Sequence, residues 1–201
     1  ANPANLYGAT KLCADKLFTA ANALSGRHRT RFSVVRYGNV IGSRGSVIPF
    51  FMQKRSSGVL PITDPRMTRF WITLAQGVQF VMDSLDRMHG GEIFVPKIPS
   101  MGIMDVAKAV APECRTEVIG IRPGEKLHEI MITPDDALNT LELQDHYVIQ
   151  PAADWWKQEE FRERTGARPV EEAFQYSSDR NGQWMTADQL RELLEHEIIE
   201  R

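Results

Sequence analysis

Hydrophobic positions along this chain change repeatedly between helix-like and strand-like spacing. Apolar residues recur every three or four positions from Leu6 to Leu24, which predicts an amphipathic helix over residues 7–24 that ends at Ser25. Further helices are predicted at residues 47–54, 74–88, 104–110 and 187–199. A capping box of Thr186 and Gln189 precedes the last of these helices.

Short runs rich in β-branched and aromatic residues predict strands between the helices. They cover residues 31–37, 60–63, 70–73, 92–95 and 117–121, and a glycine-rich loop at 38–45 follows the first. The sequence Arg-Pro-Gly-Glu at 122–125 is expected to open one more helix, which would run to Met131. From Pro134 to Gln183 the pattern weakens. Strands that alternate with helices predict an α/β fold.

The composition narrows the class of protein. The 201 residues are 42% hydrophobic and 25% charged, which excludes disordered, collagen-like and coiled-coil chains. No apolar run approaches the roughly 18 residues of a membrane span. Cys13 and Cys114 provide neither a disulfide framework nor a metal-ligand spacing. We therefore expect no metal site and a reducing, cytoplasmic location.

Charge is unevenly distributed along the chain. Residues 1–152 carry 17 basic and 14 acidic side chains, whereas residues 153–201 carry 7 and 12. Between Arg27 and Arg69, eight arginines and Lys54 stand against the single acid Asp64. This excess favours an anionic ligand such as a phosphate, a diphosphate or a nucleic acid, and the alternative is a solvated basic face.

Tyr7 and Lys11 form the first candidate chemical pair. They lie four residues apart on the first predicted helix and therefore share one face. An ammonium beside a phenol stabilises the phenolate, which would let Tyr7 act as an acid/base, and the same lysine could donate to a nucleotide ribose. The alternative is an ordinary solvated contact between the two side chains.

A second candidate site is the loop from Gly38 to Ser46, which ends where a helix is predicted to begin. Free N–H groups at that point, together with Arg44, would bind phosphate oxygens, and Asn39 could donate an amide hydrogen bond. The alternative is a plain strand-to-helix turn. Arg69 and Arg122 would complete a diphosphate site if they converged with Arg44 on one cleft.

His128 and three tryptophans are further site candidates. His128, just beyond Arg122, is interpreted as a structural residue more readily than as a catalytic one. The tryptophans at 155, 156 and 184 could stack on a base, but packing is the simpler interpretation.

Longer stretches of the chain resemble a known family. Asn-Leu-Tyr-Gly-Ala-Thr-Lys at 5–11 resembles the Tyr-x-x-x-Lys signature of extended short-chain dehydrogenase/reductases. The resemblance to the inverting, C5-epimerising UDP-N-acetylglucosamine 4,6-dehydratases is carried by ANPANLYGATKLCADKLF, VVRYGNVIGSRGSVIPFF, LPITDPRMTRFWITL, GGEIFVPKIPSM, IGIRPGEKLHE and YSSDRNGQW. These motifs extend over nearly the whole chain.

The resemblance implies the C-terminal part of an extended Rossmann-type dehydratase. Such enzymes carry a Gly-rich cofactor loop and an Asp–Lys acid/base pair upstream of the stretch that resembles residues 1–3, and neither is found here. We therefore expect a portion of a longer enzyme that is inactive by itself and leaves an apolar face exposed. The implied parts are the end of the dinucleotide-binding domain at 1–45, mainly a substrate lobe at 46–150, and a closing tail at 151–201.

The resemblance also implies roles for individual residues. Tyr7 and Lys11 would be catalytic, and with Val40 they would contact NADP. The UDP-sugar would be lined by Asn39, Arg44, Gly45, Ser46, Val47, Thr63, Arg69, Arg122, Gln183 and Trp184.

The implied reaction converts UDP-N-acetylglucosamine to UDP-2-acetamido-2,6-dideoxy-β-L-arabino-hex-4-ulose for pseudaminic acid and surface or flagellin glycan synthesis. The implied enzyme is a homo-oligomer with neither nucleic acid nor membrane as a partner. Two alternatives stay open. One is a retaining or capsule-type dehydratase, which shares the RYGNV, SRGSV and RPGEK patterns, and the other is a non-catalytic UDP-sugar-binding module.

Overall fold

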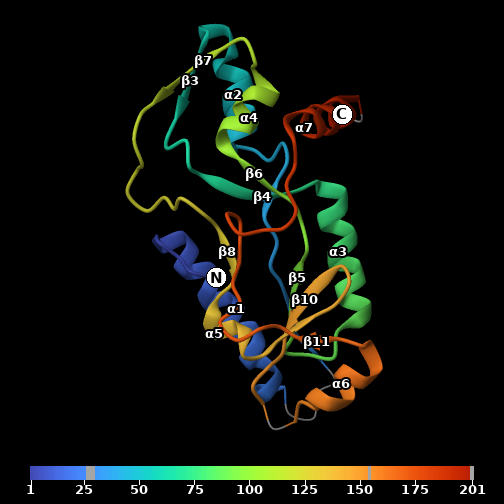
Figure 1. Ribbon diagram of the computed structural model, residues 1–201. Helices are drawn as coiled ribbons and strands as arrows, with labels where there is room; N and C mark the ends of the chain where they lie inside the picture. Colours follow the sequence, from blue (N-terminus) through green and yellow to red (C-terminus); the bar gives the residue numbers. More distant parts are fainter. Residues whose placement is uncertain (26–29, 154, 200–201) are drawn as a thin grey trace. The chain divides into compact units, whose positions relative to one another are not determined.

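The computed structural model describes residues 1–25, 30–153 and 155–199 (Figure 1). The chain forms two units, and each is assembled from three separate segments. Unit 1 comprises residues 1–37, 75–97 and 130–176, and unit 2 comprises residues 38–74, 98–129 and 177–201. The units interleave because β-strands of each unit come from distant segments of the chain. The functional division expected from the resemblance, at residues 1–45, 46–150 and 151–201, stays a prediction.

Unit 1 contains a five-stranded sheet in the order β1-β5-β10-β9-β11. Its strands are β1 (Val34–Val35), β5 (Ile93–Pro96), β10 (His146–Ile149), β9 (Thr140–Glu142) and β11 (Arg168–Pro169). β1 and β5 pair in parallel, and the other pairs are antiparallel. The helices of this unit are α1 (Leu6–Leu24), α3 (Leu74–Arg87), α5 (Pro134–Ala137) and α6 (Gln158–Thr165). Only the first residue of α3, Leu74, is assigned to unit 2.

Helices α3 and α6 each contribute a phenylalanine to a buried cluster of unit 1. Phe80 of α3 and Phe161 of α6 pack with Phe94 and Val148 of the sheet. In Figure 1, α3 lies beside β5 and β10. The opposite stripe of α3 is apolar but exposed at Leu74, Val78, Val81, Met82 and Leu85. Helix α1 likewise exposes Leu6, Leu17, Phe18 and Leu24. The expectation of exposed apolar faces therefore agrees with these two helices.

Unit 2 contains two small sheets. β2 (Asn39–Val40), β4 (Thr68–Ile72) and β6 (Ser100–Gly102) form one, and β3 (Val59–Ile62) pairs in parallel with β7 (Arg115–Val118) in the other. The helices are α2 (Val47–Lys54), the short 3₁₀ helix η1 (Arg55–Ser57), α4 (Ile103–Val110) and α7 (Ala187–Ile199). Trp71, Phe51, Leu60 and Leu190 lie in one buried core. The chain passes from unit 1 to unit 2 within β12 (Tyr176–Ser177), which pairs with β8 (Ile130–Ile132).

The helices predicted from periodicity form with nearly the predicted bounds. The Asn5 side chain accepts a hydrogen bond from the Gly8 N–H at 2.8 Å and thereby caps α1. Thr186 and Gln189 form the predicted capping box of α7 through reciprocal hydrogen bonds of 2.8 and 3.2 Å.

The helix predicted over 122–131 is wrong. Gly124 adopts a left-handed conformation (φ 82°), and residues 122–125 form a single turn closed by the Glu125 N–H and the Arg122 carbonyl. The carbonyls of Lys126 and Leu127 accept hydrogen bonds from the Arg69 side chain, so they are engaged by tertiary contacts rather than by a helix. The segment then enters β8.

The strand predicted over 31–37 is too long, because only β1 is regular. The Phe32 N–H bonds to the Asn22 side chain at 3.0 Å, and that contact takes the start of the segment out of the sheet. The loop expected at 38–45 contains β2, and the weakly patterned region after Pro134 contains β9, β10, β11, β12, α5 and α6. Across the described residues, no helix combines the length and apolarity needed to span a membrane.

Candidate functional site

Tyr7 and Lys11 lie in the first two turns of α1, in unit 1. The Tyr7 side chain is 72% exposed, and the Lys11 ammonium is 5.4 Å from the centre of its ring. The helix begins at this point because Asn5 caps it, so the cap determines that Tyr7 lies in the first turn. The pair is thus formed as the spacing predicts, with the cation over the aromatic face.

The glycine-rich loop of unit 2 connects β2 to α2. β2 pairs in parallel with β4, so that Asn39 lies opposite Trp71 and Val40 opposite Ile72. Asn39 is exposed and Val40 is half-buried. Gly38 has no room for a side chain, because a Cβ there would lie 2.6 Å from the Phe70 carbonyl oxygen. The close approach of the Gly38 and Phe70 backbones therefore determines the position of Asn39 at the start of β2.

The end of this loop has features of an anion-binding turn. Gly45 adopts a left-handed conformation (φ 74°), and Arg44 before it is exposed. Ser46 is the N-cap residue of α2, but its side chain makes no capping hydrogen bond, and its Oγ is buried without a partner in the described structure. The N–H groups of Val47 and Ile48 in the first turn point along the helix dipole, which favours a negative group. The predicted phosphate-binding loop thus has the expected local structure.

Arg69 is a half-buried arginine on β4 whose guanidinium is held by backbone carbonyls. Its Nη1 donates to the Leu127 carbonyl at 2.9 Å, and its Nη2 donates to the Lys126 carbonyl at 2.8 Å. The Glu129 carboxylate lies 3.7 Å from Nε. Burial lowers the pKa of Arg69, and the charges of Glu129 and Glu125 oppose that shift. In this structure the side chain therefore holds the 126–127 segment.

Arg122 lies at the start of the turn after β7 and is largely exposed. Its Nε is 2.9 Å from the Glu125 carboxylate, and the other oxygen of that carboxylate accepts the Arg122 N–H at 3.1 Å. Thr63, another predicted residue, is half-buried just after β3.

Gln183 and Trp184 extend the sheet that carries Arg69. The Ser100 N–H donates to the Gln183 carbonyl at 2.9 Å, and the Met185 N–H donates to the Ser100 carbonyl at 2.9 Å. The segment therefore runs beside β6, with Trp184 bridged to Ser100. Trp184 is 49% exposed, and its indole N–H donates to the Asn181 carbonyl.

The predicted site residues thus divide between the units. Tyr7 and Lys11 belong to unit 1, and all the others belong to unit 2. Within unit 2, one sheet holds Asn39 on β2 and Arg69 on the adjacent β4, and the Gln183–Trp184 segment lies beyond the next strand, β6. Convergence of Arg44, Arg69 and Arg122 on one cleft stays a prediction.

Sequence reasoning missed two residues that support this region, Thr68 and Ser178. Their hydroxyls are 2.7 Å apart, and Thr68 also contacts the ring of His128 at 2.9 Å. Thr68 begins β4 and is buried, and buried polar residues need partners, but its burial was evident only from the structure.

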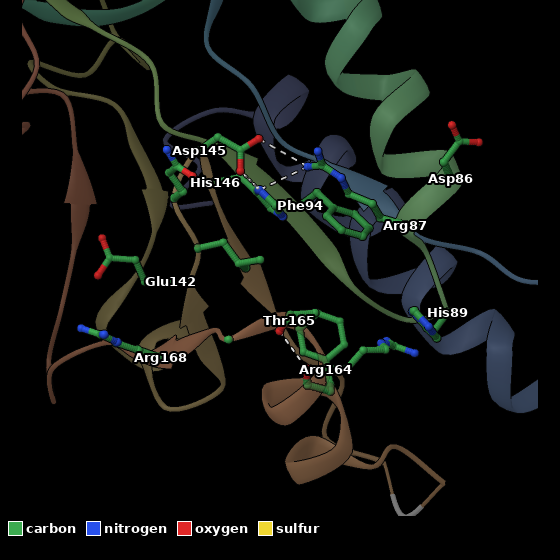
Figure 2. Close-up of a pocket in the computed structure, with 14 residues that line it drawn as sticks. Asp86, Arg87, His89, Phe94, Glu142, Asp145, His146, Arg164, Thr165 and Arg168 are labelled. Atoms are coloured by element: carbon green, nitrogen blue, oxygen red, sulfur yellow. Dashed lines mark hydrogen bonds and ion pairs between the residues drawn. The ribbon is translucent and has the colours of Figure 1, made fainter.

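Unit 1 also contains a cavity of about 860 Å³ between α3, α6 and the sheet (Figure 2). No predicted site residue lines it. Two basic side chains of its lining contact one acid: Arg87 is 3.4 Å from Asp145, and Asp145 is 2.7 Å from the His146 ring. Burial lowers the pKa of His146, and Asp145 opposes that shift.

Fold and side chains together define a Rossmann-type α/β protein of the extended short-chain dehydrogenase/reductase class, as predicted. A family model described as "Polysaccharide biosynthesis protein" matches residues 1–151. The chain belongs to that family.

Individual relatives confirm the resemblance seen in the motifs. The chain is 54% identical, over 201 aligned residues, to the UDP-N-acetylglucosamine 4,6-dehydratase (inverting) of Campylobacter jejuni subsp. jejuni serotype O:2. The match covers 97% of this chain and 60% of that protein. The dehydratase of the same name from serotype O:23/36 is 53% identical with the same coverage. A UDP-glucose 4-epimerase of Rickettsia conorii is 38% identical over 152 residues, which cover 73% of this chain and 45% of the epimerase.

Solved structures agree with this assignment. Pen from Bacillus thuringiensis matches with a TM-score of 0.82 and 34% identity, covering 98% of this chain and 60% of that one. UDP-N-acetylglucosamine 4-epimerase from Methanobrevibacter ruminantium M1, solved with UDP-N-acetylmuramic acid, matches with a TM-score of 0.53 at 16% identity over 97% and 54% of the two chains, a likeness of fold. The chain thus spans about 60% of the length of the dehydratases it matches.

Proposed function

We propose that this chain is part of a UDP-N-acetylglucosamine 4,6-dehydratase that inverts C5. The observation that carries the proposal is the 54% identity to an inverting dehydratase, which extends over 97% of this chain. The product would be UDP-2-acetamido-2,6-dideoxy-β-L-arabino-hex-4-ulose, used for pseudaminic acid and surface or flagellin glycans. We also propose that the complete enzyme is cytoplasmic and a homo-oligomer, and that these 201 residues by themselves do not turn over substrate.

Tyr7 is proposed as the acid/base at the sugar 4-hydroxyl. Its phenol is exposed on the first turn of α1, and the Lys11 ammonium lies near enough to stabilise a phenolate. A phenol and an ammonium are both donors that suit a ribose hydroxyl, so both side chains are proposed to contact a nicotinamide cofactor, with Val40 as the third contact. In our proposal, bound NADP would accept the hydride from C4 of the sugar and return it to C6.

Unit 2 is proposed to bind the UDP moiety. The uncapped N-terminus of α2, the buried Ser46 hydroxyl and the exposed Arg44 support a phosphate contact at the glycine-rich loop. Arg69, Arg122, Asn39, Thr63, Gln183 and Trp184 are proposed to contact the remainder of the nucleotide sugar. Diphosphate binding would require Arg122 to exchange its Glu125 partner for a phosphate oxygen.

The test is Tyr7→Phe in the complete enzyme with NADP. The ring is kept and the ionisable hydroxyl is lost, so we expect formation of the 4-keto-6-deoxy product to fall by about 10²- to 10⁴-fold, while UDP binding is retained. Tyr37→Phe is the matched control, because Tyr37 is another exposed tyrosine and should keep full activity. Near wild-type turnover of Tyr7→Phe would remove Tyr7 from the mechanism.

Product analysis tests the stereochemistry separately. In deuterated water, the inverting reaction places solvent deuterium at C5 with the L-arabino configuration. A product that retains the C5 configuration would instead support the retaining alternative. Binding of UDP-N-acetylglucosamine without any product from the complete protein would support the non-catalytic module.

A further inference from the structure

A buried hydrogen-bonded cluster in unit 2 joins three segments that lie far apart in the sequence. Thr68 on β4 and Ser178 after β12 are both buried, and their hydroxyl oxygens are 2.7 Å apart. The Thr68 Oγ1 is also 2.9 Å from Nδ1 of His128. Ser178 Oγ lies 3.1 Å from the Thr68 carbonyl and accepts the Glu129 N–H at 2.9 Å.

Backbone hydrogen bonds reinforce the same three segments. The Thr68 N–H donates to the Leu127 carbonyl at 3.0 Å, and the Ser178 N–H donates to the Glu129 carbonyl at 2.9 Å. The segment 126–129, which is neither helix nor strand, therefore receives its order from β4 on one side and from Ser178 on the other. Each bond contributes modestly, but leaving a buried polar partner unpaired costs more.

All three segments lead directly to residues proposed to bind the nucleotide. Arg69 follows Thr68 and donates to the carbonyls of Lys126 and Leu127. Arg122 opens the turn that leads into the same 126–129 segment. After Ser178 the chain reaches Asn181, whose side chain donates to the carbonyls of Ile98 and Gln183 and so holds Gln183 beside β6.

We infer that His128 is a positioning residue for nucleotide binding, acting through Thr68 and Ser178 on Arg69 and on the Arg122 turn. This inference rests on the proposed function for the identity of the ligand. His128 makes its contact through Nδ1, the ring nitrogen nearer to the backbone. The amide nitrogen of an asparagine at this position can occupy the position of Nδ1, whereas the amide nitrogen of a glutamine would occupy the position of Nε2. The structure thus distinguishes two substitutions of similar polarity.

The experiment compares His128→Ala, His128→Asn, His128→Gln and Thr68→Val in the complete protein. We expect His128→Ala, His128→Gln and Thr68→Val to raise KM for UDP-N-acetylglucosamine about tenfold, as the loss of a buried hydrogen bond implies, with kcat within about twofold of wild type. His128→Asn should restore KM to nearly the wild-type value. Thr165→Val in unit 1, which removes a hydroxyl that donates to the Phe161 carbonyl and accepts the Ala167 N–H, is the matched control and should change neither constant.

Hydrogen exchange provides a second measurement that does not depend on the ligand. The amides of Thr68, Glu129 and Ser178 should exchange about tenfold faster in His128→Ala and Thr68→Val than in wild type or His128→Asn. An equal effect of the Asn and Ala variants on KM and on exchange would overturn the inference, and so would unchanged exchange in Thr68→Val. If the wild-type protein neither binds UDP nor turns over its sugar, the proposed function fails, and the exchange measurement still decides whether His128 orders the segment.

Discussion

Arg36 Nε donates to Asp15 Oδ2 at 2.7 Å, and this ion pair ties α1 to the strand region of unit 1. Of the 19 residues of α1, all of which the structure describes, Asp15 is the one that is buried. Arg36 also donates to Asp136 and to the Met131 carbonyl. The helix that presents Tyr7 and Lys11 is therefore anchored by a charged contact rather than by an apolar face.

Replacing Asp15 should consequently be costly. In Asp15→Ala, the buried Arg36 guanidinium loses one of its two carboxylates, and we expect the free energy of unfolding to fall by about 3–5 kcal/mol. Urea denaturation followed by circular dichroism measures this change. Asp86→Ala, at an exposed position on α3, should shift stability by no more than about 0.5 kcal/mol. Equal effects of the two substitutions would contradict the anchoring role.

Substitution of two glycines by alanine should change the stability of the protein in opposite directions. A Cβ on Gly38 would lie 2.5 to 2.9 Å from Cβ, O and C of Phe70, so the paired backbones would have to separate. We expect Gly38→Ala to destabilise unit 2 by about 1–3 kcal/mol. A Cβ on Gly77, inside α3, would meet no atom of another element within 4 Å. Gly77→Ala should therefore stabilise the chain by about 0.5–1 kcal/mol through helix propensity. Thermal denaturation of both variants checks the pair of signs.

Stability should fall in acid partly because of Asp64. Hydrogen bonds from the Arg66 side chain and backbone lower the pKa of Asp64 to about 2. Because the unfolded carboxyl takes up its proton at higher pH, the stabilisation is complete above about pH 4 and is lost as the pH falls towards 2. Asp64→Asn should show a shallower decline of the urea midpoint across that range. If the urea midpoint of Asp64→Asn declined with pH as steeply as that of wild type, Asp64 would not contribute to the loss of stability in acid.

Nucleotide affinity should respond to Glu125. Its carboxylate is paired with Arg122 in the absence of ligand and competes with a diphosphate for the same guanidinium. Glu125→Gln keeps an acceptor for the Arg122 N–H but removes the charge, so we expect UDP to bind about two- to fivefold more tightly, the range of an exposed ion pair. Calorimetric titration with UDP measures this. Glu117→Gln on β7 is the matched control, and weaker binding by Glu125→Gln would contradict the competition.

The sequence by itself determined the elements whose information is local. Helices α1, α2, α3 and α7 follow from apolar spacing and from the Asn5 and Thr186 caps, and the Tyr7–Lys11 pair follows from helical geometry. The glycine-rich loop before α2 was also predictable, because glycine at positive φ and a serine before a helix are local signals. Long motifs then indicated the family.

Only the tertiary structure decided the features that depend on distant partners. The segment after Arg122 has helix-compatible residues, yet its carbonyls bond to Arg69 and to the Thr68 N–H, which lie more than fifty positions earlier. The region after Pro134 forms strands because β5 and β9 pair with β10, although its own pattern is weak. Backbone groups that are taken out of water must be paired, and which partner they find depends on the assembled fold. For that reason the contact of His128 with Thr68, from which its positioning role is inferred, depends on the tertiary structure.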